Sequence, residues 1–228
     1  MIWASWILEI MVKRNYQKEL EQIIEKEKDL HKKVLLHSCC APCSSYCMEY
    51  LREFFDTTVF YFNPNISLRE EYEKRVEEQK KLIAFYNKEV PQFPIAFLEG
   101  KYDPQSYFAA VKGLEDCKEG GERCFACFAL RLKETAIQAK QMGMDYFTTT
   151  LTISPLKNAE KINEIGFKIA DEVGINWLPC DFKKKNGYLR SIELSEKYGL
   201  YRQDFCGCGF SKAEREAMRG TQNKEYTK

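Results

Sequence analysis

The chain has 228 residues, with 35 basic and 34 acidic side chains, a formal net charge of +1 and 10 cysteines. This length suits one globular unit, or one and a half, and is enough to bury a substantial core. An apolar content of 44% with 30% charged residues excludes a disordered chain, and the net charge excludes a histone-like polycation. So many cysteines predict either a secreted disulfide framework or an intracellular metal site, which differ in spacing and compartment.

The first twelve residues are apolar, but they lack the pattern of a signal peptide. No basic residue precedes the apolar run, which contains Glu9 and is followed by Lys13 and Arg14. The run is also far shorter than the ~20 residues that a membrane-spanning helix needs. It is either a docking segment for a neighbouring surface or the product of an upstream start codon, with Met11 as the first native residue. We therefore expect a cytoplasmic protein without a membrane segment, whose thiols stay reduced and whose clustered cysteines bind metal.

Helices and strands are expected to alternate at short spacing along the chain. A charged helix over 16–32 comes first, followed by an apolar strand 34–37, a helix over 46–55, a strand 57–62, a helix over 68–89 and a strand 94–98. A helix over 103–111 with Asp103 as N-cap comes next, then a helix over 127–142, a strand 146–151, a helix over 158–173, a strand 175–178 and a helix over 192–198. This alternation is typical of βαβ units. It predicts an α/β protein with an open, mostly parallel sheet and helices on both faces.

The domain organisation is expected to be simple, because the chain shows no internal repeat, low-complexity tract or long linker. We expect a single α/β domain over 31–211, preceded by the apolar segment and charged helix in 1–30 and followed by a tail in 212–228. A small cysteine-bearing insertion around 103–127 and the C-terminal extension are additions to this domain.

Seven of the cysteines fall into three short-spaced groups: Cys39, Cys40 and Cys43; Cys124 and Cys127; Cys206 and Cys208. The first group directly follows the first apolar strand, the position at which open parallel sheets bind ligands. The second group precedes a predicted helix, and the third lies in a glycine-containing loop near the C-terminus. Three such groups in one cytoplasmic chain are a stronger signal than any single C-x-x-C pair.

The metal at such a site must be held mostly by sulfur, because the chain has only two histidines, His31 and His37. Thiolates select zinc or iron–sulfur clusters. Seven clustered thiols exceed one tetrahedral site and leave room for a four-iron cluster together with a mononuclear metal or a reactive thiol. Residues given a structural role are Cys47, Cys117, Cys180 and a hydrogen-bonded His37, whereas Cys43 is left open between ligand and supporting residue.

Five motifs resemble those of the cobalamin-independent epoxyqueuosine reductases. They are LLHSCCAPCS at 35–44, EGGERCFACF at 119–128, TTTLTISPLKN at 148–158, DFKKK at 181–185 and YRQDFCGC at 201–208. The resemblance covers about 33–211, and the motifs occur in the same order throughout.

This resemblance implies the last step of queuosine biosynthesis, in which the epoxide of epoxyqueuosine at the wobble position of a tRNA anticodon is reduced to an alkene. It implies a fold like that of the adenine-nucleotide α-hydrolases (the HUP or PP-loop-like group). It also implies a 4Fe-4S cluster with an adjacent mononuclear metal ion, taken to be iron. The implied partners are tRNA bearing epoxyqueuosine and an external electron donor.

The resemblance also suggests roles for individual residues. The cluster and metal ligands are expected to be Cys39, Cys40, Cys124, Cys127, Cys206 and Cys208. In one division, Cys39 or Cys40 with Cys208 holds the second metal and the others hold the cluster. The proton donor is expected to be Asp181 or Asp204, with Tyr188 and Tyr201 as alternatives. The residues expected to contact tRNA are Lys157, Lys183, Lys184, Lys185, Arg190 and Arg202.

Two other functions are compatible with the cysteine pattern. One is a zinc-thiolate module that binds nucleic acid without catalysis. The other is an ATP-dependent enzyme of the tRNA sulfurtransferase type on the same fold. The segment from Cys39 to Cys43 has no glycine that would let backbone amides wrap a pyrophosphate, which argues against the use of ATP.

Overall fold

The computed structural model of the protein describes residues 14–225, with side chains to residue 219. The two interpretations of the apolar N-terminal run concern residues outside this range. None of the described helices is long and apolar enough to cross a bilayer.

A five-stranded sheet lies at the centre of the fold, and all of its strand pairs are parallel. Its strands are β1 (Lys33–His37), β2 (Asp56–Tyr61), β3 (Ala96–Glu99), β4 (Tyr146–Thr149) and β5 (Asn176–Trp177). They are ordered β3-β2-β1-β4-β5. The chain therefore places β2 and β3 on one side of β1 and then crosses to place β4 and β5 on the other side. The reversal creates a topological switch point between β1 and β4, where such sheets form a ligand-binding crevice.

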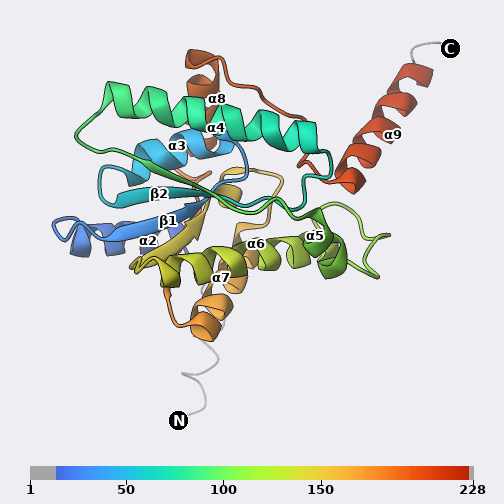
Figure 1. Ribbon diagram of the computed structural model, residues 1–228. Coiled ribbons are helices and arrows are strands. Elements are labelled where there is room, and N and C mark those ends of the chain that lie inside the picture. Colours follow the sequence, from blue (N-terminus) through green and yellow to red (C-terminus); the bar gives the residue numbers. More distant parts are fainter. Residues whose placement is uncertain (1–13, 226–228) are drawn as a thin grey trace, which may run out of the picture.

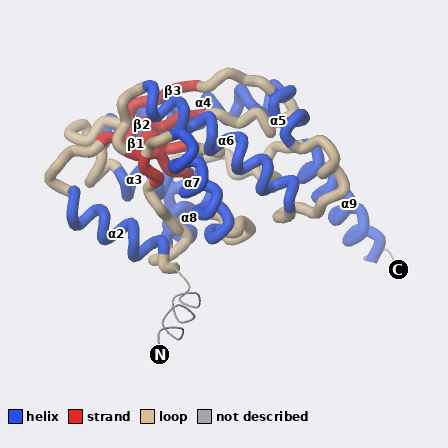
Figure 2. Tube along the Cα trace, turned by 90° about the horizontal axis from the view of Figure 1, so that it is seen from below, coloured by secondary structure: helices blue, strands red, loops and turns tan. Residues whose placement is uncertain are grey.

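Helices cover both faces of the sheet, as Figure 1 shows. Helices α3 (Ala41–Leu51), α4 (Arg69–Glu89) and α8 (Gly187–Lys197) lie on one face, and α6 (Glu122–Gln141) and α7 (Ala159–Val173) lie on the other. The remaining helices are α2 (Tyr16–Glu27), α5 (Pro104–Ala110) and α9 (Gly209–Glu225). Figure 2 shows that α9 extends away from the sheet beyond α5. The expected α/β architecture is therefore confirmed.

The core forms where apolar strand residues meet the helices. Leu35 is fully buried in β1, pairing with Thr58 of β2 and Phe147 of β4. Because both faces of a parallel sheet are covered, its strands are nearly continuous apolar runs. His37, at the carboxyl end of β1, is also fully buried, and its ring nitrogens contact Thr149 Oγ1 at 2.9 Å and the Phe62 carbonyl at 3.1 Å. Burial lowers the pKa of His37 to about 3, so it is the packed, neutral histidine that the sequence predicts.

Several helix boundaries differ from the sequence prediction, beginning with α3, which starts at Ala41 instead of Tyr46. Helix α6 begins at Glu122, so Cys124 and Cys127 lie inside its first turns and not in a preceding loop. Helix α8 begins at Gly187, where a Cβ atom would collide with the Phe182 carbonyl, and this tight turn brings the helix start forward. Helix α9 occupies a region that was expected to contain no helix.

Candidate metal centre

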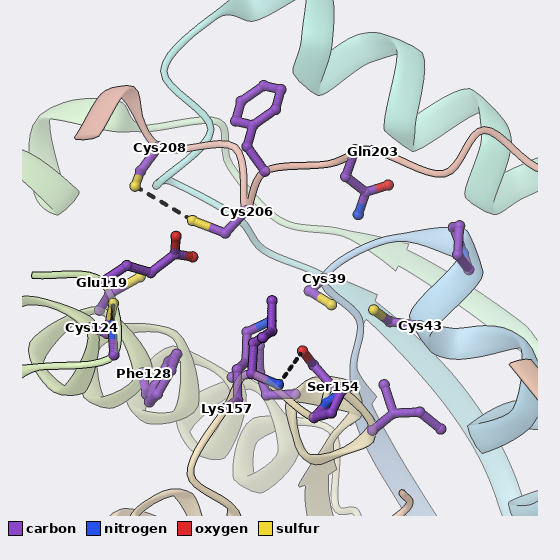
Figure 3. Close-up of a pocket in the computed structure, with 18 of the residues that line it drawn as sticks. Cys39, Cys43, Glu119, Cys124, Phe128, Ser154, Lys157, Gln203, Cys206 and Cys208 are labelled. Carbon is purple, nitrogen blue, oxygen red and sulfur yellow. Dashed lines mark hydrogen bonds between the residues drawn. The ribbon is translucent and has the colours of Figure 1, made fainter. Parts of the chain in front are cut away.

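A cavity of about 370 Å³ opens at the carboxyl ends of β1 and β4. Its walls come from the loop after β1, the 3₁₀ helix η2 (Thr150–Ile153) with the loop after it, the start of α6 and the loop before α9. The cysteines that line it are Cys39, Cys43, Cys124, Cys127, Cys206 and Cys208. Figure 3 shows the labelled members of this set around one space, with Lys157 and Ser154 on another side of it. The fold thus joins all three cysteine groups at the switch point.

The first cysteine group is the most compact. The sulfurs of Cys39, Cys40 and Cys43 all lie within 4.8 Å of one another, the one such group of three metal-ligating side chains in the described part of the chain. Hydrogen bonds with Cys40 and Cys43 hold the pKa of the Cys39 thiol well below its usual range, and Thr150 Oγ1 donates to the same sulfur at 3.4 Å. Within this group, Cys39 is therefore the thiol whose thiolate form is most favoured by its neighbours.

A buried polar network fixes the loop that carries these thiols. The Gln79 Oε1 atom accepts hydrogen bonds from Ser38 Oγ at 2.7 Å and from Ser44 Oγ at 2.8 Å. The Asn63 amide donates to the Ser38 carbonyl at 2.8 Å. Gln79 is fully buried in α4. It therefore fixes the chain on both sides of the first cysteine group, at Ser38 and at Ser44. The positions of the thiols are thus set by α4 as well as by the strand that precedes them.

The second group lies on one face of α6. Cys124, Cys127 and Arg131 are spaced at i, i+3 and i+7, so their side chains point to the same side of the helix. The Gly120 amide donates to Cys124 Sγ at 3.2 Å. Burial raises the pKa of the Cys127 thiol to about 11, so a metal ion or cluster must displace its proton.

The third group lies in the loop that leads into α9. The sulfurs of Cys206 and Cys208 are 3.4 Å apart, and the interaction with Cys208 lowers the pKa of Cys206 to about 6. Gly207, between them, has a φ of 105°, and a Cβ atom there would lie 2.8 Å from Ile66 Cγ1. The Gly207 carbonyl also accepts a hydrogen bond from the Ser67 amide at 3.1 Å. A glycine is therefore needed to press this loop against the segment after β2.

The cysteines that line the cavity differ by one from the expected ligand set. Five of the six expected cysteines line the cavity, together with Cys43, which the sequence left open. Cys40 is almost completely buried behind Cys39, with its sulfur 3.9 Å away. Cys47 and Cys180 lie fully buried in the main core, in agreement with a structural role. Cys117 is partly exposed and does not line the cavity.

The two expected proton donors have different surroundings. Asp204 lines the cavity and forms an ion pair with Arg219. Asp181 is buried, pairs with Lys183 at 2.8 Å, and is not among the residues that line the cavity. Of the alternative donors, Tyr188 lines the cavity and Tyr201 does not.

The six basic residues expected to contact tRNA divide by their partners. Lys183, Lys185 and Arg190 form ion pairs with Asp181, Glu21 and Glu49. Lys157 and Arg202 line the cavity and form no ion pair with a carboxylate within the described residues, and Lys184 is exposed on the surface. The lysine run at 183–185 is thus partly used for internal ion pairs, which a linear sequence does not reveal.

Several residues of the cavity were not singled out from the sequence, among them Glu119, Arg75, Arg123 and Arg131. Glu119 and Arg123 stand inside the motif at 119–128, so their proximity to Cys124 was a usable signal. Arg131 could have been found from its helical spacing to the two cysteines of α6. Arg75 lies on α4, far from any cysteine in the sequence, and only the fold brings it there.

The donor set fits a sulfur-ligated metal or cluster. Six thiols line one cavity, and the second and third pairs face the compact first group instead of merging with it. The six thiols exceed the four donors that one tetrahedral ion needs close together. The fold and the site therefore define an α/β protein with a doubly wound parallel sheet, whose switch-point crevice carries clustered thiols where related folds carry a phosphate-binding loop.

Comparisons with known proteins specify the family. The sequence profile described as "Epoxyqueuosine reductase QueH" matches residues 34–214. The chain is 41% identical over 201 residues to Epoxyqueuosine reductase QueH of Streptococcus pyogenes, covering 87% of this chain and 78% of that protein. It is 42% identical over 217 residues to the Staphylococcus epidermidis protein of the same name, covering 92% and 91%. Against that of Thermotoga maritima it is 36% identical over 185 residues, covering 80% and 91%. The chain belongs to the epoxyqueuosine reductase QueH family.

Proposed function

We propose that the protein reduces epoxyqueuosine to queuosine in tRNA, the last step of queuosine biosynthesis, and that it does so in the cytoplasm. Its family membership supports this function, since the matched relatives bear the name epoxyqueuosine reductase. The observation that carries the proposal is the meeting of six cysteines, from three distant parts of the chain, around one cavity at the switch point. The resemblance noted in the sequence rested on these same cysteine motifs.

The proposed cofactors are a 4Fe-4S cluster and an adjacent mononuclear iron. The residues that would hold them are the cysteines lining the cavity together with Cys40. When bound, a cluster supplies electrons one at a time, and a Lewis-acidic ion polarises an epoxide oxygen. In the compact group, the sulfurs of Cys40 and Cys43 both lie within 4.8 Å of the Cys39 sulfur, so either can complete a ligand set with it.

The overall reaction determines what the protein must provide. Both carbon–oxygen bonds of the epoxide break, a carbon–carbon double bond forms, and the oxygen leaves as water. Two electrons come from an external electron donor, and two protons come from the protein and solvent. The proton delivered to the oxygen needs a donor within hydrogen-bond reach, and Asp204 is the one of the two expected aspartates that lines the cavity.

The substrate nucleoside must leave the anticodon stack to enter this cavity. Bases turned out of single-stranded loops commonly stack on aromatic rings while cations hold the phosphates. Tyr188, Lys157 and Arg202 line the cavity and provide one aromatic ring and two cations. These residues form the proposed wobble-nucleotide contact, and the exposed Lys184 is a further candidate for contact with tRNA.

The function is tested by purifying the full-length protein without oxygen, measuring iron and acid-labile sulfide, and supplying a chemical reductant and tRNA that contains epoxyqueuosine. The expected protein is brown, and the nucleosides released from the tRNA become lighter by one oxygen atom. A colourless protein with bound zinc and no turnover would favour the zinc-thiolate module instead. Turnover that requires ATP would favour the sulfurtransferase type.

Replacing Lys157 by glutamine is expected to weaken tRNA binding about tenfold and to lower the slope of log affinity against log salt by about 1. The reason is that its ammonium group lines the cavity and forms no ion pair with a carboxylate of the described chain. The control is Lys185→Gln, because Lys185 already pairs with Glu21. Both variants are measured by tRNA binding over a range of salt concentrations. Unchanged affinity in Lys157→Gln would contradict the phosphate contact.

A further inference from the structure

Arg131 differs from the other buried arginines around the cavity in its partners. Arg131 is 4% exposed and lines the cavity from the third turn of α6. It donates to two neutral acceptors, the Cys127 carbonyl at 3.4 Å and the Asn63 Oδ1 atom at 3.3 Å. By contrast, Arg75 pairs with Glu71 at 2.6 Å and Arg123 pairs with Glu214 at 2.7 Å. Within the described residues, Arg131 forms no ion pair with a carboxylate.

A guanidinium group cannot lose its proton in a protein, so its burial is costly unless hydrogen bonds or nearby negative charge compensate it. The negative groups that Arg131 meets are sulfurs. Burial alone would lower the pKa of Arg131, but negative charge at Cys127, Cys39, Cys206 and Cys124, once these thiols are ionised, raises it. These four cysteines represent all three groups of the cavity. Arg131 therefore lies within electrostatic reach of all three groups, around the cavity that they line.

Its hydrogen bonds hold the guanidinium in that place. Asn63 accepts from Arg131 and donates to the Ser38 carbonyl at 2.8 Å, which directly precedes the first cysteine group. Asn63 and Ser38 are both buried. Arg131 is thus tied through one amide to the loop of Cys39 and through its own helix to Cys127. It cannot move toward solvent without breaking both connections.

We propose that Arg131 is a fixed counter-cation of the metal centre and helps to set its reduction potential. This role rests on the proposed function, because it assumes a redox-active cluster held by the cavity cysteines. A cluster with thiolate ligands is anionic, and gaining an electron makes it more so. A permanent positive charge in a buried, low-dielectric position stabilises the reduced form more than the oxidised form. Arg131 is a positioning residue in this sense, since it acts on the cluster and need not touch the substrate.

The test compares a neutral variant, Arg131→Gln, with a charge-retaining variant, Arg131→Lys, in anaerobically loaded full-length protein. Redox titration followed by the cluster's visible absorbance is the measurement. We expect Arg131→Gln to shift the one-electron equilibrium about tenfold toward the oxidised cluster, a midpoint potential about 59 mV lower. We expect Arg131→Lys to keep a potential close to that of the unmodified protein, although it loses the planar fork.

A matched control separates this effect from loss of a buried arginine in general. Arg52 is 6% exposed, donates to the carbonyls of Tyr86, Val90 and Phe93, and does not line the cavity. Arg52→Gln is expected to lower the melting temperature without moving the midpoint potential.

Each outcome of this series decides the proposal. An unchanged potential in a loaded Arg131→Gln protein overturns it while leaving the proposed function intact. If Arg131→Gln fails to hold iron but Arg131→Lys loads it at an unchanged potential, the charge is required even for assembly and the proposal stands. If both variants fail to hold iron, the guanidinium has a structural role and the proposal falls. Absence of iron in the unmodified protein overturns the proposed function itself, and the inference with it.

Discussion

Replacing Cys206 by alanine is expected to reduce the iron content of anaerobically purified protein and to lower kcat/KM by at least about 100-fold. Cys206 lines the cavity next to Cys208, in a loop fixed by Gly207 and by the Asn65 amide, which donates to the Cys206 carbonyl at 3.2 Å. Loss of a ligand should exceed the 10–100-fold losses that follow from changes around ligands. Iron and sulfide per protein chain and the nucleosides of treated tRNA are measured together.

The control for this variant is a cysteine that the structure places in the core. Cys47 is fully buried and donates to the Cys43 carbonyl at 3.3 Å, one turn away on α3. We expect Cys47→Ala to keep its iron and its turnover and to lose about 1 kcal/mol of stability. If Cys206→Ala behaved in the same way as Cys47→Ala, Cys206 would be removed from the ligand set.

Replacing Asp204 by asparagine is expected to lower kcat by about 100-fold or more with iron content unchanged, because general acid catalysis typically contributes 10²–10⁴-fold. Asp204 is placed for this role at the cavity wall, two residues from Cys206, with a half-exposed side chain. Single-turnover reduction of tRNA by pre-reduced protein measures the step without the external electron donor.

Asp181→Asn is the matched comparison, since the sequence analysis names both aspartates as candidate proton donors. Its carboxylate pairs with Lys183 away from the cavity lining, and we expect turnover within a few-fold of the unmodified protein. A large loss in Asp181→Asn with full iron, and none in Asp204→Asn, would reverse the assignment. If neither variant lost turnover, Glu119 would be the carboxylate to examine, as it too lines the cavity.

The fold was accessible from the sequence because its strands and helices have clear periodicity and clear ends. The apolar run at 34–37, the Asn158 cap and the left-handed Gly174 after α7 each identify an element without knowledge of its neighbours. The starts of α6 and α8 were placed too late, because contacts from elsewhere in the chain stabilise their first turns. Arg123, in the first turn of α6, pairs with Glu214 of α9 at 2.7 Å, a partner that local pattern cannot supply.

The candidate site was accessible only in part. Short-spaced cysteines are visible in a linear sequence, so all three groups and their shared chemistry could be predicted. The different positions of Cys40 and Cys43 could not be predicted. Their order in the chain does not say which sulfur lines the cavity and which lies behind Cys39. The tRNA-contacting lysines show the same limit, since the pairing of Lys185 with Glu21 depends on where α2 packs.

By itself, the sequence determined the fold class, the thiol-based character of the site and its resemblance to one family. These depend on local periodicity and on residue types at short spacing, which are visible in the linear sequence. Only the tertiary structure decided that the three cysteine groups share one cavity and that Arg131 lies beside it with no carboxylate partner among the described residues. It also decided that Asp204 reaches the cavity wall while Asp181 does not. The physical reason is that charge compensation and burial are properties of neighbours in space, and the return of the chain from β3 to β4 sets those neighbours.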